Sequence, residues 1–221
     1  MISLAKSELE NFESIQSFIK DFKKIIGTSN ESRVSDFLNQ QNEKIKNRYS
    51  NLFKNSLPYL KNSERIVTLS NSKTITEVLK RLNKIRKITV IIGESRPQFE
   101  GRIMARELIK HKIKVEIIPD ALLLNAIEKS DLAIISADII LSNGDVVNKI
   151  GSRGLAIACK HFKKPFYVLA TSDKFSKKRK YVGEKRNAKE IWDYDHKLLT
   201  KTNYYFEIVE KTLVTKIITE L

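Results

Sequence analysis

From Arg65 to the end of the chain, short runs of β-branched and apolar residues alternate with segments of helical periodicity. Near-continuous apolar strands of four to six residues, each followed by a crossover helix, are typical of a parallel sheet covered on both faces. The alternation therefore predicts an α/β fold, a Rossmann-like, doubly wound and mostly parallel sheet. The expected strands are Ile66–Leu69, Ile88–Ile92, Lys114–Ile118, Leu132–Ile135, Phe166–Ala170 and Tyr205–Val209.

The segment before Arg65 has a different pattern, in which apolar residues recur at three- and four-residue steps, as in amphipathic helices. One expected helix runs from Ile2 to about Ile26. A second begins with Ser35 as its N-cap and closes at Pro58. We predict a short helical N-terminal unit over residues 1–62 and a Rossmann-like domain over residues 63–221, and we find no chemistry in the N-terminal unit.

Composition narrows the cellular setting. The 221 residues include one cysteine, Cys159, which cannot form an intramolecular disulfide and therefore fits a reducing compartment. The first thirty residues lack the apolar core of a signal peptide, and no apolar run approaches the roughly 20 residues that cross a bilayer. We expect a cytoplasmic protein with no membrane contact, no metal and no cofactor.

The net charge of +15 would attract polyanions such as nucleic acid, nucleotides or ribosomes. A compositional bias that fills solvated helix faces with lysine explains the same charge, so charge alone does not decide between the two. The densest basic segment runs from Lys174 to Lys189. RNA binding, if it occurs, is expected at the basic residues Lys177, Lys178, Arg179 and Lys180.

Ligands of doubly wound sheets bind beyond the carboxyl ends of the strands, so the residues after each strand are the candidates for function. After the first strand, Ser70 opens a hydroxyl-rich turn that enters a helix and that could hold a phosphate. Capping of the helix explains the same residues. The second strand ends at Gly93, which permits a sharp turn, and Arg96 follows with a planar fork matched to phosphate, unless a glutamate of the rim pairs with it.

The residues that follow the fourth expected strand form the most specific cluster of candidate functional residues in the chain. Asp138 stands at the end of a buried strand, where a carboxylate is costly to desolvate and therefore needs partners or a task. Asn143-Gly144 predicts a turn back toward a helix that Asn148 would cap. Lys149 would then place a positive charge beside a bound phosphate.

Several motifs, in this order and spacing, resemble the initiation factor 2B family, which includes the α, β and δ regulatory subunits, archaeal homologues, methylthioribose-1-phosphate isomerase and ribose-1,5-bisphosphate isomerase. The resemblance covers about Arg65 to Leu221. The motifs are Gly93-Glu94-Ser95-Arg96-Pro97 with Glu100-Gly101, Ala137-Asp138 with Asn143-Gly144, Asn148-Lys149-Ile150-Gly151, and Pro165-Phe166-Tyr167-Val168 before Lys174-Phe175.

The resemblance implies a phosphate-ligand pocket lined by Arg96, Asp138, Asn148, Lys149 and Lys174, with Ser70 on its floor. The isomerases of this family use a cysteine after the first strand together with the aspartate that Asp138 matches. Ser70 stands at the cysteine position, and an unassisted hydroxyl is a far weaker acid than a thiol. Cys159 lies in a helix, where small buried cysteines are ordinary core residues.

The leading hypothesis is therefore a non-catalytic regulatory subunit that binds a sugar phosphate or nucleotide. It would act as a homodimer or higher oligomer, with a translation factor as a possible partner. The enzymatic alternative is a ribose-1,5-bisphosphate isomerase type of aldose–ketose isomerase in which Asp138 is the acid/base. A third hypothesis is RNA or ribosome binding through the basic loop.

Overall fold

The computed structural model describes residues 13–26 and 31–221. Residues 2–12 of the expected N-terminal helix lie outside this range, and the helix is seen from Glu13 to Ile26, as α2. The second helix, α3 (Glu31–Leu60), begins earlier than expected, so Ser35 lies inside it rather than at its N-cap. Pro58 stands within the last turn of α3, close to where the helix was expected to close.

The central element is a six-stranded parallel sheet with the order β3-β2-β1-β4-β7-β9. Its strands are β1 (Arg65–Thr68), β2 (Thr89–Gly93), β3 (Lys114–Ile118), β4 (Leu132–Ile135), β7 (Phe166–Leu169) and β9 (Lys216–Ile218). The strand order reverses between β1 and β4, which is the switch point where doubly wound sheets bind ligands. The predicted Rossmann-like α/β fold is thus confirmed.

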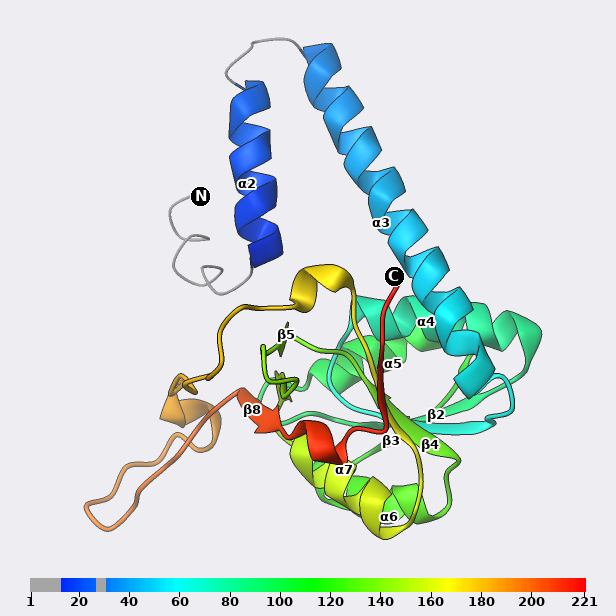
Figure 1. Ribbon diagram of the computed structural model, residues 1–221. Coiled ribbons are helices and arrows are strands. Elements are labelled where there is room, and N and C mark those ends of the chain that lie inside the picture. The colour runs from blue at the N-terminus through cyan, green and yellow to red at the C-terminus, as the bar shows by residue number, and fades with distance from the viewer. Residues whose placement is uncertain (1–12, 27–30) are drawn as a thin grey trace.

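Helices cover both faces of this sheet, as Figure 1 shows. The helices that follow the first two strands lie with α3 on one face, and the remaining two lie on the other. They are α4 (Lys73–Ile85), α5 (Glu100–Lys110), α6 (Leu123–Glu128) and α7 (Ser152–His161), with short 3-10 turns η1 (Asp120–Leu122), η2 (Ser172–Lys174), η3 (Ala188–Glu190) and η4 (Lys211–Leu213).

A second, antiparallel sheet corrects two sequence predictions. It has the order β5-β6-β8 and consists of β5 (Ile139–Ile140), β6 (Val146–Lys149) and β8 (Phe206–Val209). The expected strand 205–209 therefore pairs with β6 and not with the parallel sheet, whose last strand is β9. Asn148 lies in strand β6 and does not cap a helix; its amide donates to Ser152 Oγ over 2.9 Å.

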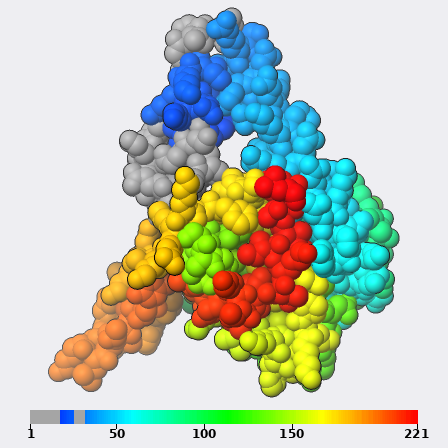
Figure 2. Space-filling model, viewed as in Figure 1, coloured from blue at the N-terminus to red at the C-terminus, as the bar shows by residue number. Residues whose placement is uncertain are grey.

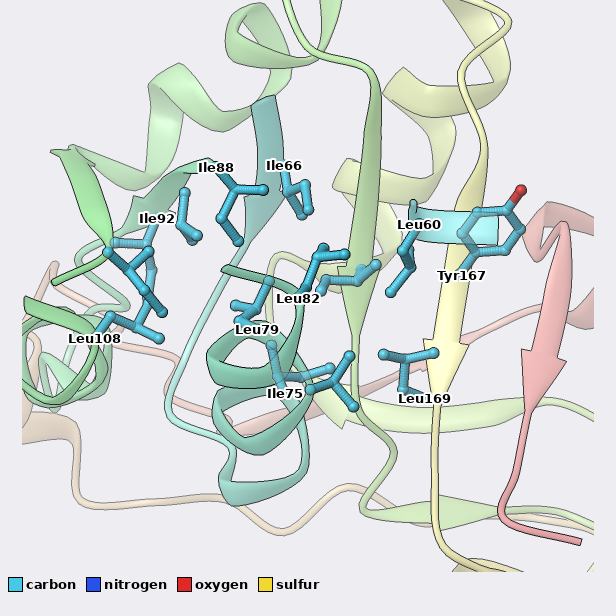
Figure 3. Packing of buried hydrophobic residues seen from close by; sticks show 14 of the residues in the cluster. Leu60, Ile66, Ile75, Leu79, Leu82, Ile88, Ile92, Leu108, Tyr167 and Leu169 are labelled. Atoms are coloured by element: carbon cyan, nitrogen blue, oxygen red, sulfur yellow. The ribbon is translucent and has the colours of Figure 1, made fainter. Parts of the chain in front are cut away.

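The core has one cluster on each face of the sheet. Figure 3 shows the first, in which Ile75, Leu79 and Leu82 of α4 share one cluster with Leu60 of α3 and with residues of the sheet. Neighbouring strand residues point in alternate directions, so Ile66 joins this cluster while Val67 joins the cluster under α6 and α7. Both clusters are closed to solvent at their centres.

The N-terminal helices reach away from this body. In Figure 1, α2 and the first half of α3 stand above the sheet, and the last turns of α3 lie against α4. Phe18 and Phe22 of α2 pack with Phe37 of α3, at ring-centroid distances of 5.8 and 6.2 Å. Leu52 and Leu60 of α3 are fully buried in the first core cluster. The second half of α3 thus belongs to the same core as the sheet.

A long connection between η2 and β8, residues 175–205, forms an arm that extends from the body in Figures 1 and 2. Its two limbs meet at a β-bridge between Lys185 and Tyr204. Trp192 and Tyr194 stack in the arm, with ring centroids 4.7 Å apart. Among the described residues, no helix is both long and apolar enough to span a membrane.

Candidate functional site

A pocket of 640 Å³ opens at the carboxyl edge of the parallel sheet, at the switch point between β1 and β4. The turn after β1, the loop after β4, the end of β6 and η2 after β7 form its floor and walls, and α2 and α3 contribute to its rim. Its polar lining includes Arg48, Ser70, Ser72, Lys73, Thr74, Glu100, Asp138, Asn148, Lys149, Asp173 and Lys174. Segments distant in sequence therefore meet at one site.

Five of the seven expected site residues line this pocket: Ser70, Asp138, Asn148, Lys149 and Lys174. Gly93 and Arg96 do not. Arg96 is exposed and lines a separate hollow beside α6; its guanidinium lies 5.0 Å from the ring centroid of Phe99 and donates to the carbonyl of Ile191 over 3.4 Å. The structure therefore does not bring the guanidinium of Arg96 into the pocket that Lys149 lines.

The turn after β2 has a structural role that explains this placement. The carboxylate of Asp120 accepts the backbone N–H groups of Ser95 and Arg96, each over 2.7 Å. Ser95 Oγ in turn accepts the backbone N–H of Ser70 over 2.7 Å. The motif that suggested a phosphate-binding arginine thus fixes the backbone at Ser70, which has a left-handed φ of 63°.

Ser70 begins the turn that leads into α4, and the first turn of this helix also lines the pocket. Ser72 caps α4 by accepting the backbone N–H of Ile75 over 3.4 Å. Capping therefore accounts for Ser72. It does not account for the position of Ser70 in the pocket. A helix of 13 residues that begins at a pocket also favours an anion there, through the partial positive charge of its N-terminus.

Asp138 follows β4, and its carboxyl interacts electrostatically with both Lys174 and Lys149. Burial raises the pKa of its carboxyl to about 6, against the opposing attraction of Lys174 and Lys149. A carboxyl group with a pKa this close to neutrality can both accept and donate a proton under physiological conditions. This chemistry is that of a general acid/base.

Lys149 is the most deeply buried cation of the pocket, with a side chain that is only 3% exposed. Its ammonium donates to Glu100 Oε1 over 2.6 Å and lies 4.7 Å from the ring centroid of Tyr205. The other carboxylate oxygen of Glu100, Oε2, is buried without a hydrogen-bond partner. Glu100 is a pocket residue that we did not single out from the sequence, although it belongs to the motif that begins at Gly93.

Helix α3 contributes Arg48 to the rim of the pocket. Arg48 lies 3.4 Å from Asp173 Oδ1 and 3.9 Å from Glu220 Oε1. Glu220 is buried and accepts hydrogen bonds from both the backbone N–H and the hydroxyl of Ser172. These contacts tie α3, the turn that carries Lys174 and the end of the chain together. The expectation that the N-terminal helices carry no chemistry overlooked Arg48, which no motif marked.

The basic residues of the arm do not reach this pocket. Lys177, Lys178, Arg179 and Lys180 are exposed on the arm and are absent from its lining. The chain's single cysteine, Cys159, lies in α7, where burial raises the pKa of its thiol to about 12. Such a thiol does not ionise near neutrality and belongs to the second core cluster.

With this geometry in view, comparison with known proteins identifies the family. The model of the family described as "Initiation factor 2 subunit family" matches residues 5–221. The chain belongs to this family. The family has enzymes and translation factors among its relatives, so membership alone does not separate a regulatory subunit from a sugar-phosphate isomerase.

Two relatives illustrate this range. A ribose 1,5-bisphosphate isomerase of Archaeoglobus fulgidus is 32% identical over 169 residues, which cover 73% of this chain and 54% of that protein. The crystal structure of the Pyrococcus horikoshii translation initiation factor eIF-2B is 30% identical, with a TM-score of 0.73, and the match covers 86% of this chain and 67% of that one.

The tetrameric eIF2B β2δ2 complex of C. thermophilum contains a chain with a TM-score of 0.69 and 17% identity, over 94% of this chain and 70% of that one. At this identity the likeness concerns the fold. The chain spans a little over half the length of the curated isomerase that it matches, at 54%.

Proposed function

We propose that this chain is a non-catalytic regulatory member of its family that binds a phosphorylated small molecule, a sugar phosphate or a nucleotide. The observation that carries the proposal is the composition of the pocket at the switch point. The hydroxyl-rich turn at Ser70 and the first turn of α4 face the same 640 Å³ space as Lys149 and Lys174. Phosphate is bound in proteins by this combination of ammonium groups, hydroxyls and a helix N-terminus.

The same pocket lacks the group that the family's isomerases use beside the aspartate. Ser70 follows β1 where those enzymes have a cysteine, and the only cysteine of the chain is buried in α7. A serine hydroxyl needs a neighbouring base before it exchanges protons at neutral pH. We therefore propose that the chain retains the phosphate-binding groups of the family but does not catalyse the isomerisation.

Thermal melting with ribose 1,5-bisphosphate, nucleoside monophosphates and inorganic phosphate tests this function. A ligand that binds the folded state stabilises it by about 2.7 kcal/mol at 100 times its dissociation constant, so at least one phosphorylated ligand is expected to raise the melting temperature. Lys174→Ala should reduce this shift, while Lys177→Ala, on the exposed arm, should preserve it. If no phosphorylated compound raises the midpoint, the proposal fails.

A second candidate function rests on Asp138. Its carboxyl has the near-neutral pKa of a general acid/base, which suits proton transfer between C1 and C2 of a sugar in an aldose–ketose isomerase. Incubation with ribose 1,5-bisphosphate, followed by NMR detection of the ketose product, distinguishes the candidates. Product formed by the unmodified chain and abolished by Asp138→Asn would establish the isomerase and overturn the non-catalytic proposal.

We also propose that the chain is part of an oligomeric assembly. One structural neighbour forms part of a tetrameric complex of translation-factor subunits. We therefore expect this chain to associate with a second copy of itself or with a translation-factor partner. Analytical ultracentrifugation of the purified chain tests the first part, and a single species with the mass of one chain at micromolar concentration would contradict self-association.

A further inference from the structure

A second cavity, of 370 Å³, lies on the outer surface between α4 and the turn that follows α5. One side is formed by residues of α4 spaced three and four apart, which therefore share a face of this helix. The other side is the turn that leads into β3, at the opposite edge of the sheet from the pocket described above. We call this cavity the basic groove; its lining consists of Glu77, Lys80, Arg81, Asn83, Lys84, Lys87, His111 and Lys112.

The charge of the basic groove is strongly one-sided. Lys80 and Arg81 both pair with Glu77, at 3.0 and 2.8 Å. Although burial opposes it, hydrogen bonds from Lys80 and Arg81 lower the pKa of Glu77 to about 2, so this carboxylate stays ionised at neutral pH. One negative charge thus faces five positive ones.

Three of the five cations remain available to a ligand. Lys84, Lys87 and Lys112 are exposed, and none has a carboxylate within ion-pair distance in the described part of the chain. A concave surface lined by charges of one sign focuses the electrostatic potential into the cavity. The carbonyl ends of α4 and α5 oppose this potential only by their partial charges. The basic groove is therefore a site for an anion.

The chemistry of the lining restricts the kind of anion. Every lining residue is charged or polar, so the basic groove has no aliphatic or aromatic residue of the kind that protein partners bury as anchors. Lysine ammonium groups act as point charges for phosphate, and interfaces with nucleic acid are polar and positive. We propose that the basic groove binds closely spaced phosphates, supplied by an RNA backbone or by a free polyphosphate.

The arm offers a competing basic surface with a different shape. Lys177, Arg179 and Lys180 lie in the first limb of the arm, where the carbonyl of Lys178 accepts the backbone N–H of Ser142, and none of them lines the basic groove. Three cations of the arm, Arg186, Lys189 and Lys201, are paired with nearby carboxylates. Lys177, Arg179 and Lys180 are exposed and form no ion pair in the described part of the chain, so the two surfaces differ in shape: the basic groove is a cavity, and these residues do not line it. Two triple variants that each remove three positive charges can separate the surfaces.

The first variant is Lys84→Gln, Lys87→Gln and Lys112→Gln, and the matched control is Lys177→Gln, Arg179→Gln and Lys180→Gln. All six side chains are exposed, so both proteins should fold, which a melting curve checks. Binding of a short, fluorescently labelled RNA duplex of mixed sequence is measured by anisotropy, with tripolyphosphate as competitor, from low to moderate salt. Unlabelled tripolyphosphate is also titrated alone by calorimetry.

We expect the groove variant to bind RNA about tenfold more weakly with a shallower salt dependence, because three phosphate contacts are lost. The control should stay within about twofold of the unmodified chain. If the unmodified chain binds tripolyphosphate but not RNA, and the groove variant loses this binding, the phosphates are supplied by a free polyphosphate. Equal loss in the control, or no loss in the groove variant, overturns the proposal. A ligand-induced melting shift from the switch-point pocket should persist in the groove variant, which separates the two sites.

Discussion

Asp138 shows how one partly buried carboxyl links the pocket to the stability of the chain. Its pKa is raised by burial from 3.8 to about 6, so between these values the folded state binds more protons than the unfolded state. The contribution of Asp138 to the free energy of unfolding therefore falls as the pH rises from about 4 to about 6, and it stays at this lower value above that range. This dependence is opposite to that of a salt-bridged aspartate.

The exchange Asp138→Asn tests this sign. We expect it to raise the free energy of unfolding at pH 8 by up to about 3 kcal/mol, because the amide carries no charge to desolvate. At pH 4 the difference should vanish. Urea unfolding at both pH values measures it, and the same exchange at exposed Asp36 on α3 serves as the control. An equal effect of Asp138→Asn at both pH values would contradict this account.

Gly101, in the first turn of α5, is required by a close approach of the backbone. A Cβ atom at this position would lie 1.8 Å from the carbonyl oxygen of Gly93, which is backbone and cannot rotate away. Gly101→Ala is therefore expected to destabilise the chain by about 3 kcal/mol, since the β2–α5 turn must shift. Chemical denaturation provides the measurement.

Gly154 in α7 provides the matched control. A Cβ atom there would meet only Leu124 Cδ2, at 3.6 Å, an ordinary contact distance. Because glycine is unfavourable inside a helix, Gly154→Ala should leave stability unchanged or raise it by up to about 1 kcal/mol. If Gly101→Ala likewise leaves stability unchanged or raises it, helix propensity, and not the contact with Gly93, dominates at this position.

At this scale the sequence predicted part of the site. Asp138 and Ser70 follow strands that could be recognised, and such residues converge at one edge of a parallel sheet. Lys149 also lines the pocket, but from the end of β6 and not from the start of a helix. Arg96 also follows a strand, but its direction depends on Asp120, a residue 24 positions away whose hydrogen bonds no local pattern reveals. Arg48 belongs to a helix whose contact with the pocket is likewise decided by tertiary packing.

Among the elements, α3 has two halves with different environments. Its second half contributes Leu52 to the core, fully buried, whereas Leu38 in the first half is 41% exposed. Leu52→Ala should therefore lower the free energy of unfolding by about 2–5 kcal/mol, and Leu38→Ala by less than about 1 kcal/mol. Both are measured by urea unfolding, and similar losses would indicate that the two halves are equally packed.

The elements that the sequence missed are short or belong to the smaller sheet. β5 has two residues, and the segment that forms β6 has the sequence pattern of a helix start, because Asn148 is a good cap and Gly151 follows it. β9 has three residues, one of them an exposed lysine, so it lacks the apolar run of the other parallel strands. Pairing partners distant in the chain, and not local preference, stabilise these strands.

For the molecule as a whole, the question is whether the two core clusters unfold together. The cluster under α3, α4 and α5 and the cluster under α6 and α7 share the same sheet, because alternate residues of each strand point into each. α3 also bonds to the end of the chain, where Asn55 donates to the carbonyls of Thr219 and Leu221 over 2.9 and 3.2 Å. Loss of packing on one face should therefore weaken the other.

Cys159 reports on this coupling, because it lies in the second cluster, on the face opposite Leu52. Its buried thiol, with a pKa raised to about 12, should react with a disulfide reagent only after the chain opens. If opening is global and fast to reverse, Leu52→Ala should accelerate labelling in proportion to its loss of stability, by about 30-fold for 2 kcal/mol. The measurement is the labelling rate at pH 8 in the absence of denaturant. An unchanged rate in a destabilised Leu52→Ala variant would show that the α6–α7 face opens independently of α3.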